Sequence, residues 1–232
     1  MTIISIETST SVCSVAVSVD GITQLSRINH DGANHAKLLP VYIKELLDET
    51  SARGWHIDAV ALSEGPGSYT GLRIGASTAK GLCYGLNVPL IPIPTTEVLC
   101  ASVKCQSSTD RYLPMIDARR MEVYTALYDA DIKPLTPIQA VVLDNKDNLS
   151  TFNVQHSTYY FGDGAEKARP ILESDNWHFI PDIVPDASYM GALAEKKFNE
   201  PATRKSVTEL AYYEPFYLKQ FVAAPSHVKG LT

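Results

Sequence analysis

Residues 64–75 of the chain read Glu64-Gly65-Pro66-Gly67-Ser68-Tyr69-Thr70-Gly71-Leu72-Arg73-Ile74-Gly75. This stretch follows an apolar segment with strand character and leads into a helical pattern. Gly65 and Gly67 permit backbone conformations that are closed to other residues, and Pro66 fixes the turn between them. The stretch therefore predicts a tight glycine loop between a strand and a helix.

Two interpretations of this glycine loop remain open. Ser68 or Thr70 can cap the new helix, whose first N–H groups have no partner inside the helix. In one interpretation the loop is a compact connection in which Gly71 and Gly75 allow close packing. In the other interpretation the helix N-terminus is a cradle for an anion. The stretch matches neither the P-loop pattern nor the dinucleotide-binding pattern.

The residues before the loop predict a meander of strands and one helix. Apolar residues favour strands at 3–6, 12–19 and 22–28, and Asp20-Gly21 is a strong hairpin signal. Asn34 can cap an amphipathic helix over 34–51, and a short strand is predicted at 57–62.

The residues after the loop complete one lobe and begin another. A helix at 71–86, a strand at 88–93 and a helix at 95–104 close a first lobe that we place at residues 1–108. The second lobe, 109–232, is predicted to hold strands at 112–116, 122–128, 135–143 and 158–161, a helix from Ala165, a helix at 187–198 capped by Asp186, and an extended segment at 214–218. The C-terminal segment is free to pack back on the first lobe. The pattern predicts an α/β protein with two similar lobes.

Composition narrows the classes of function. The chain has 232 residues, 45% of them apolar, and a formal net charge of −6. Its densest basic spots are the pairs Arg119-Arg120, Lys196-Lys197 and Arg204-Lys205, which do not form the basic face that nucleic-acid binding alone requires. If RNA is the substrate, a partner must bring the positive surface. No apolar run is long enough for a membrane span and no signal peptide is visible, so we expect a cytoplasmic protein.

Several motifs of the chain resemble those of a known family. Residues 65–75, GPGSYTGLRIG, resemble the signature of the TsaB (YeaZ) family. Further segments agree in order and spacing: IETSTSVCSVAV at the start, NHAKLLP at 34–40, IDARRMEVYTALY at 116–128 and PFYLK at 215–219. The resemblance touches both lobes and most of the chain.

The resemblance implies a fold and a role. TsaB proteins have the two-lobed actin/sugar-kinase/Hsp70 (ribonuclease H-like) fold, with a mixed sheet in each lobe. They pair with a catalytic relative, TsaD, and act with the ATPase TsaE to place a threonylcarbamoyl group on the adenosine next to the anticodon of tRNAs that read codons beginning with A. The implied subunit is non-catalytic, meets tRNA only through the complex, needs no cofactor of its own, and can form a homodimer when alone. A nucleotide at the partner interface is compatible with it.

The sequence lacks the catalytic motifs of related enzymes. Active members of the fold class commonly carry Asp in the first hairpin, where this chain has Glu7, which weakens a kinase interpretation without excluding it. TsaD relatives bind a metal through two histidines four apart, whereas His30 and His35 are five apart. No hydrolase nucleophile motif is visible. We therefore expect no catalytic and no metal-binding residues.

Two surfaces are candidates for contacts with a partner. The helices at 34–51 and 71–86 carry more apolar residues than one buried stripe needs, which suits either an interface or cover by the same chain. The interface interpretation assigns partner binding to Leu38, Leu39, Tyr42, Leu46, Ile74, Thr78 and Leu82. The second surface is the polar turn with Asp117, Arg119 and Glu122, which is either a solvated, salt-bridged hairpin or a surface that faces the cleft or the complex.

Three functions from different classes follow. The first is a scaffold and activator subunit of the tRNA-modifying complex, and the family resemblance favours it. The second is an active ATP-dependent phosphotransferase of the same fold, for which Gly162-Asp163-Gly164 is a weak second phosphate turn. The third is a peptidase-like relative. Lys219 stands where the family often has Arg, so a bidentate contact at this position would be altered.

Overall fold

The computed structural model describes residues 1–32, 34–103, 110–144, 152, 156–172 and 176–219. The first sheet has the order β3-β2-β1-β4-β5. Its strands are β1 (Thr2–Glu7), β2 (Cys13–Val19), β3 (Ile22–Asn29), β4 (Ala59–Gly65) and β5 (Leu90–Pro94). β1, β2 and β3 pair antiparallel, whereas β4 pairs parallel with both β1 and β5, so the sheet is mixed.

The predicted turn between β2 and β3 is confirmed. Asp20 and Gly21 both have positive φ, 48° and 72°. Such a pair is typical of the two-residue hairpin turn whose twist matches that of the strands it joins. The strong local signal in the sequence therefore sets this hairpin.

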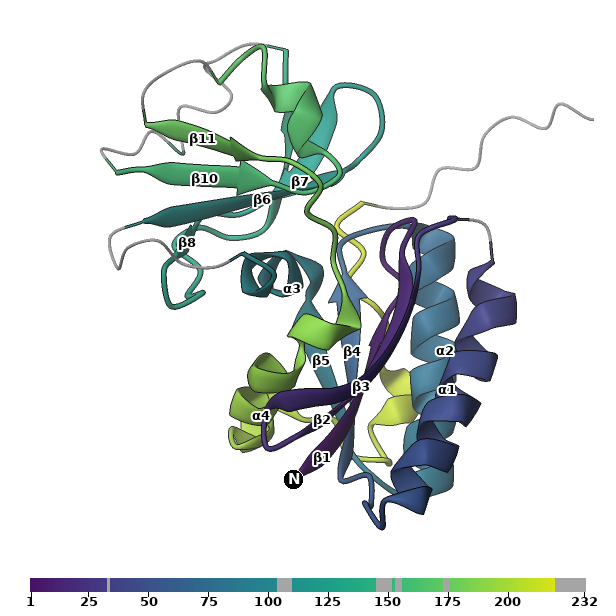
Figure 1. Ribbon diagram of the computed structural model, residues 1–232. Helices are drawn as coiled ribbons and strands as arrows, with labels where there is room; N and C mark the ends of the chain where they lie inside the picture. The colour runs from purple at the N-terminus through teal and green to yellow at the C-terminus, as the bar shows by residue number, and fades with distance from the viewer. Residues whose placement is uncertain (33, 104–109, 145–151, 153–155, 173–175, 220–232) are drawn as a thin grey trace, which may run out of the picture.

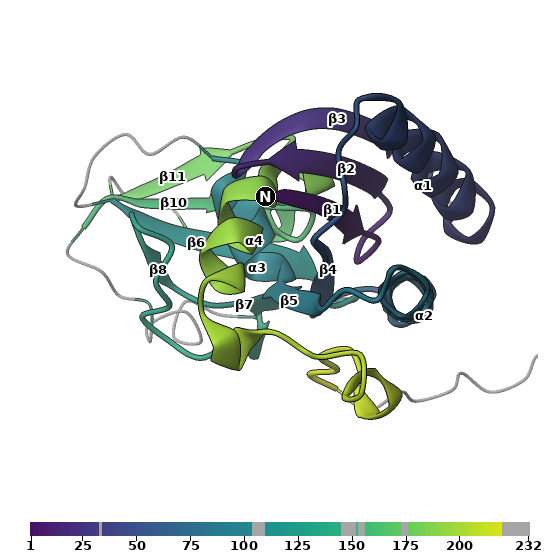
Figure 2. The ribbon, with the colours of Figure 1, turned by 90° about the horizontal axis from the view of Figure 1, so that it is seen from below.

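Helices cover both faces of the first sheet (Figure 1). Along β1, Ile4 and Ile6 belong to a core cluster with α1 (His35–Ala52) and α2 (Tyr69–Leu86). Ile3 belongs to the cluster on the opposite face, with α3 (Thr95–Ala101) and α4 (Gly191–Phe198). Figure 2 shows the same layers from below. Successive side chains of a strand point to opposite faces, so an apolar run such as β1 predicts a sheet buried on both sides.

The second sheet has the order β11-β10-β6-β7-β9, and β8 pairs with β6. Its strands are β6 (Arg111–Asp117), β7 (Glu122–Thr125), β8 (Tyr128–Asp129), β9 (Gln139–Val142), β10 (Thr158–Phe161) and β11 (Trp177–Ile180). β10 pairs parallel with β6 and β11, and β7 pairs antiparallel with β6 and β9. Each lobe thus has a mixed sheet, as predicted.

Several boundaries in the second lobe differ from the prediction. The strand expected at 122–128 is divided into β7 and β8, because the backbone of Leu127 bonds to a loop instead of a strand. Its carbonyl accepts from the backbone N–H groups of Leu135 and Thr136, and its N–H donates to the Thr136 hydroxyl. The helix expected from Ala165 is a short 3₁₀ turn, Ala165–Ala168, followed by Pro170. Proline restricts the residue before it, so a helix rarely continues there.

The helix expected at 187–198 also differs from the structure. It begins as a 3₁₀ turn, Ala187–Tyr189, capped by Asp186, and only then continues as α4. β11 was not predicted.

The chain returns to the first lobe after the second sheet. Ala187, Met190 and Ala194 belong to the first-lobe core. Leu210 and Tyr213 join the core cluster beneath α1 and α2. Residues 104–109 lie outside the described residues, so the boundary at residue 108 stays a prediction. Among the described residues, none of the helices combines the length and apolar character that a membrane crossing requires.

Candidate functional site: the inter-lobe cleft and the helix groove

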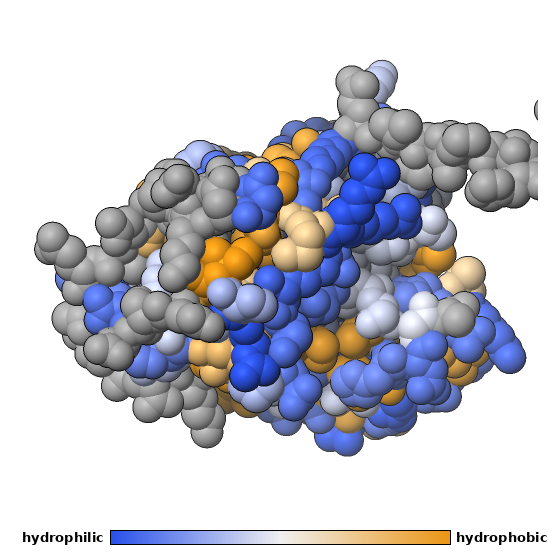
Figure 3. All heavy atoms as spheres, turned by 90° about the horizontal axis from the view of Figure 1, so that it is seen from above, coloured by the Kyte–Doolittle hydropathy of each residue, from blue (hydrophilic) through white to orange (hydrophobic). Residues whose placement is uncertain are grey.

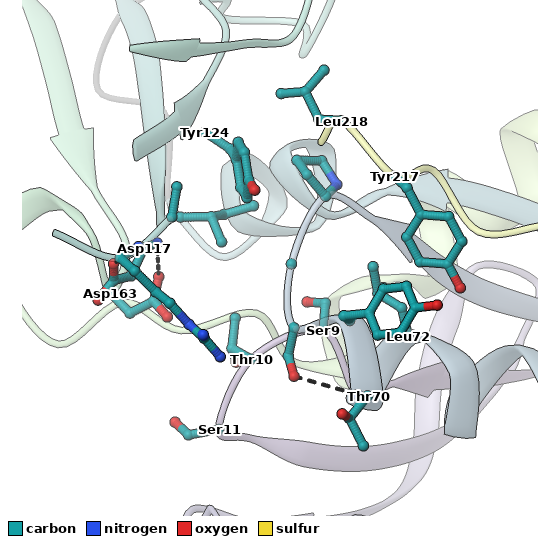
Figure 4. A pocket seen from close by; sticks show the side chains of 18 of the residues that line it. Ser9, Thr10, Ser11, Thr70, Leu72, Asp117, Tyr124, Asp163, Tyr217 and Leu218 are labelled. Carbon is teal, nitrogen blue, oxygen red and sulfur yellow. Dashed lines mark hydrogen bonds between the residues drawn. The ribbon is translucent and has the colours of Figure 1, made fainter. Parts of the chain in front are cut away.

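A cleft of about 710 Å³ lies between the two lobes. One wall is formed by the β1–β2 turn at 9–11 and the glycine loop at 66–71. The other wall comes from the second lobe, with Asp117 and Asp163, and the segment at 216–219 closes a further side. Figure 4 shows Asp117 and Asp163 across the cleft from Ser9, Thr10 and Ser11. Seen from above, hydrophilic side chains mix with smaller apolar areas over this side of the molecule (Figure 3).

The glycine loop packs directly against the β1–β2 turn. A Cβ atom on Gly67 would lie 2.3 Å from the Ser9 carbonyl oxygen, and one on Gly71 would lie 2.1 Å from the Thr8 carbonyl oxygen. The Ser68 backbone N–H donates to the Ser9 carbonyl at 2.6 Å. The Thr8 hydroxyl donates to the Gly71 carbonyl at 2.9 Å. Only residues without a side chain allow the two backbones to approach so closely.

The start of α2 is capped within the chain. The Ser68 Oγ accepts from the Gly71 backbone N–H at 3.3 Å (Figure 4). A Cβ on Gly75 would lie 2.3 Å from the Thr8 hydroxyl oxygen. The compact-connection interpretation therefore accounts for Gly67, Gly71 and Gly75 by packing alone. The anion-cradle interpretation stays a hypothesis.

The carboxylate of Glu7 lies beneath the cleft rather than in it. Its side chain is fully buried, and its Oε1 accepts from the Ser9 backbone N–H. Burial raises the pKa of Glu7, and the nearby Asp186 adds to that rise. Glu7 is thus engaged by the turn that follows it and is absent from the residues that line the cleft.

The polar turn of the second lobe is a network of local contacts. The Arg119 backbone N–H donates to Asp117 Oδ1 at 2.6 Å, and Arg119 has a positive φ of 69°. The Asp117 backbone N–H donates to Asp163 Oδ1 at 2.9 Å, and Lys167 pairs with the Asp117 carboxylate. Arg119 lines the cleft, whereas the ion pair of Asp117 is with Lys167.

Two aromatic side chains meet at the cleft, Tyr69 of the predicted glycine loop and Tyr217 of the C-terminal motif, and their contact was not predicted. The Tyr69 and Tyr217 rings lie with centroids 5.1 Å apart. Arg73 donates to the Tyr69 hydroxyl at 3.1 Å and lies over its ring. The sequence contained these residues in two quoted motifs, GPGSYTGLRIG and PFYLK, but only the tertiary structure brings the motifs together.

His30 and His35 do not share a helix face. His35 Nε2 lies 3.0 Å from the carbonyl oxygen of Val12, just before β2, and His30 lies just beyond β3. Among the described residues, no three His, Cys, Asp or Glu side chains are grouped as a metal site.

The assignment of partner-binding residues needs two corrections. Leu39 and Leu46 are fully buried in the first-lobe core, where they pack with β2 and β4 residues such as Val15 and Leu62. A side chain without exposed surface in its own lobe cannot contact a partner. Leu38, Tyr42, Ile74 and Leu82 pack against the same cluster but keep part of their surface.

A groove between α1 and α2 offers the accessible apolar surface instead. It has a volume of about 440 Å³ and is lined by Pro40, Ile43, Lys44, Leu47, Asp48, Thr78, Gly81 and Leu82. Thr78 and Leu82 are among the predicted partner-binding residues, whereas the sequence analysis did not single out Pro40, Leu47 or Gly81. The helical pattern marks the apolar side of each helix but does not tell which part of that side the sheet covers.

The fold and part of the sequence are similar to those of known proteins. The two lobes, each with a mixed sheet, and the cleft between them are consistent with the actin/sugar-kinase/Hsp70 class of folds. Residues 30–180 match the family model described as TsaD, tRNA N6-adenosine threonylcarbamoyltransferase. The structure is similar to YeaZ from Pseudomonas aeruginosa with a TM-score of 0.77 at 23% identity, covering 94% of this chain and 99% of that one.

Curated relatives identify the family. The chain is 34% identical over 229 residues to the tRNA threonylcarbamoyladenosine biosynthesis protein TsaB of Escherichia coli, covering 96% of each chain. It is 30% identical over 203 residues to the protein of the same name from Bacillus subtilis, covering 84% of this chain and 82% of that one. The chain belongs to the TsaB (YeaZ) family.

Proposed function

We propose that this chain is the scaffold and activator subunit of a tRNA-modifying complex. It pairs with a TsaD-like enzyme that places the threonylcarbamoyl group on N6 of the adenosine next to the anticodon in tRNAs reading A-starting codons. The main support for this proposal is the similarity, over nearly the whole chain, to proteins named for threonylcarbamoyladenosine biosynthesis. A TsaE-like ATPase completes the complex in the cytoplasm, and tRNA reaches this chain only through it.

The position of Glu7 supports a non-catalytic role. An acid that helps to hold a metal–nucleotide complex must present its oxygens to the cleft. Here the carboxylate is enclosed under the β1–β2 turn, and burial raises its pKa, which favours the neutral form over the charged form that binds a cation. The phosphotransferase alternative predicts ATP turnover by this chain alone, and a turnover assay with the isolated chain tests it directly.

The α1–α2 groove supports pairing with a related chain. Gly81 and Gly85 lie inside α2, where glycine is less favourable than alanine by about 1 kcal/mol per residue. Among the described residues, a Cβ atom at either position would meet nothing within 4 Å. Gly81 lines the groove, so a side chain there would fill space that is open in the isolated protein. We assign this groove to the TsaD-like partner, whose own helices would approach α2 closely at Gly81.

The groove assignment is tested by size-exclusion chromatography with light scattering. This chain is mixed with the TsaD-like protein of the same organism, and Kd is measured by titration. Gly81→Leu should weaken pairing at least about fivefold, because overpacking an interface costs about 1–3 kcal/mol. Gly85→Leu adds the same side chain one turn along the same helix, outside the groove lining, and a smaller loss of affinity there would centre the interface on the groove.

The possible results distinguish the assignment of the groove as the interface from the proposed scaffold role. Equal affinities of Gly81→Leu and the unmodified chain would move the interface elsewhere, while an unmodified chain that never binds the TsaD-like protein would overturn the scaffold role. A homodimer of the isolated chain that Gly81→Leu dissolves would mean that the groove also accepts a second copy. Threonylcarbamoyl transfer to tRNA by the reconstituted proteins, absent when this chain is omitted, completes the test.

A further inference from the structure

The segment at 214–219 touches both lobes beside the cleft. It follows Tyr213, which is buried in the first-lobe core. Phe216, Tyr217, Leu218 and Lys219 all line the cleft. Figure 1 shows the C-terminal part of the described chain, in yellow, running beside β4 toward the second lobe.

The first-lobe attachment is built into the glycine loop. The Phe216 backbone N–H donates to the carbonyl of Glu64, at the end of β4, at 2.8 Å. A Cβ on Gly65 would lie 2.7 Å from the Phe216 carbonyl oxygen, and Gly65 has a φ of +114°. Glycine at this position therefore leaves room for the segment to pass. The Tyr217 ring then packs on Tyr69.

The second-lobe attachment is ionic. Lys219 pairs with Glu122 on β7, and its Nζ lies 6.0 Å from the centroid of the Tyr124 ring. The Glu122 side chain is 19% exposed, so water screens the pair only in part. Lys219 is the last described residue before 220–232.

The lobes also meet through α3. Leu99 and Cys100 share a core cluster with second-lobe residues such as Tyr112 and Phe161. The Thr96 hydroxyl lies 2.7 Å from the Tyr128 hydroxyl. This contact is buried, whereas the contact at 214–219 is partly exposed and is described by one hydrogen bond, one ring pair, one ion pair and one cation–π contact.

We propose that residues 214–219 form a C-terminal clasp that holds the second lobe at a set distance from the glycine loop and so sets the width of the cleft. The buried α3 contact joins the lobes permanently. The clasp opens by local unfolding, because segments held by few, partly exposed contacts open before the core does. It is a property of the isolated chain and does not depend on the pairing proposed above.

The test uses charge reversal and hydrogen exchange. Exchange of the Phe216 amide hydrogen reports the closed clasp, since that amide donates to Glu64. Lys219→Glu places two carboxylates together and should speed this exchange about fivefold, the effect of roughly 1 kcal/mol on an opening equilibrium. Glu122→Lys should act alike, and the double variant Lys219→Glu/Glu122→Lys should restore the rate. Lys196→Glu, on the exposed side of α4, is the control for net charge.

A second readout follows the lobes themselves. Spin labels at Ser77→Cys and Met121→Cys, in a Cys105→Ser background, report the distance between α2 and the second-lobe hairpin. Either single reversal should broaden this distribution, and the double variant should narrow it again. Unchanged exchange and an unchanged distribution in Lys219→Glu would overturn the clasp, as would failure of the double variant to restore both.

Discussion

The two halves of α2 each carry a pair of glycines four residues apart, Gly71 and Gly75 in the first half and Gly81 and Gly85 in the second. In the first pair, a Cβ atom would lie within 2.3 Å of Thr8 atoms. In the second pair, a Cβ atom would meet no atom of the described part of the chain within 4 Å. The same spacing therefore has two different physical reasons within one helix.

The difference shows where a glycine pattern points to another molecule. The first pair is explained by the turn between β1 and β2, which approaches the helix backbone too closely for any side chain. The second pair lowers the stability of the helix, and no contact within the described chain requires glycine there. Such a position is expected where the missing side chain leaves room for a partner, and Gly81 lies in the α1–α2 groove.

The largest effect is expected from Gly71→Ala. Its Cβ would lie 2.1 Å from the Thr8 carbonyl oxygen, and backbone atoms cannot move aside as a flexible side chain can. We expect the free energy of unfolding to fall by about 3 kcal/mol, the upper end of the usual cost of overpacking. Urea denaturation followed by circular dichroism measures it. Gly81→Ala is the control, and an equal effect at both positions would erase the distinction between the two pairs.

A smaller effect on stability is expected from the ionisation of Glu64, the residue that precedes Gly65 at the start of the glycine loop. Burial raises the pKa of Glu64 from 4.5 to about 7, against the opposing charge of Lys197. The folded state then binds more protons than the unfolded state between these values, so stability falls as the pH rises from 4.5 to 7. Glu64→Gln should remove about 2 kcal/mol of this fall, discounted from the full linkage value for partial solvent screening.

Denaturation at several pH values across this range measures the Glu64 contribution. Glu7 contributes a fall in the same direction, because burial also raises its pKa. The difference between the parent chain and Glu64→Gln isolates Glu64. Parallel pH profiles for the two proteins would show that Glu64 is not the group that titrates.

The smallest effect is expected at the second pair and has the opposite sign. Gly81→Ala and Gly85→Ala should each raise the free energy of unfolding by about 0.4–1 kcal/mol, because alanine restricts the unfolded chain and favours the helix. Thermal denaturation of the isolated protein measures both. A loss of stability at Gly81 would place an unseen contact at that position and remove the argument for a partner.

Local signals predicted local structure well. Asp20-Gly21 predicted its hairpin, and Ser68, one of the two predicted cap candidates, caps α2, because each depends on neighbouring residues. Asn34 precedes α1 without a side-chain cap hydrogen bond. β11 was missed because all four of its residues, Trp177–Ile180, are half-buried and show no alternation. Leu39 and Leu46 were assigned to a partner because helical periodicity does not tell which of two apolar sides the sheet covers.

Much of the candidate site could not be predicted for the same reason. Gly65 and Lys219 belong to motifs that the sequence shows far apart. Their contacts with Phe216 and Glu122 exist only because the chain returns to the first lobe after the second sheet. Glu7 was visible as a carboxylate, but its enclosure under the β1–β2 turn depends on how that turn packs.

The sequence by itself determined the two-lobed α/β organisation, the glycine loop and the resemblance to the TsaB family. These depend on residue types at short spacings, which the backbone converts directly into turns, caps and periodic faces. Only the tertiary structure decided which glycines serve the chain's own packing, which apolar side chains remain open to a partner, and how the last described residues bridge the lobes. Those outcomes depend on contacts between segments far apart in the chain, and burial and close approach are properties of such contacts rather than of any single segment.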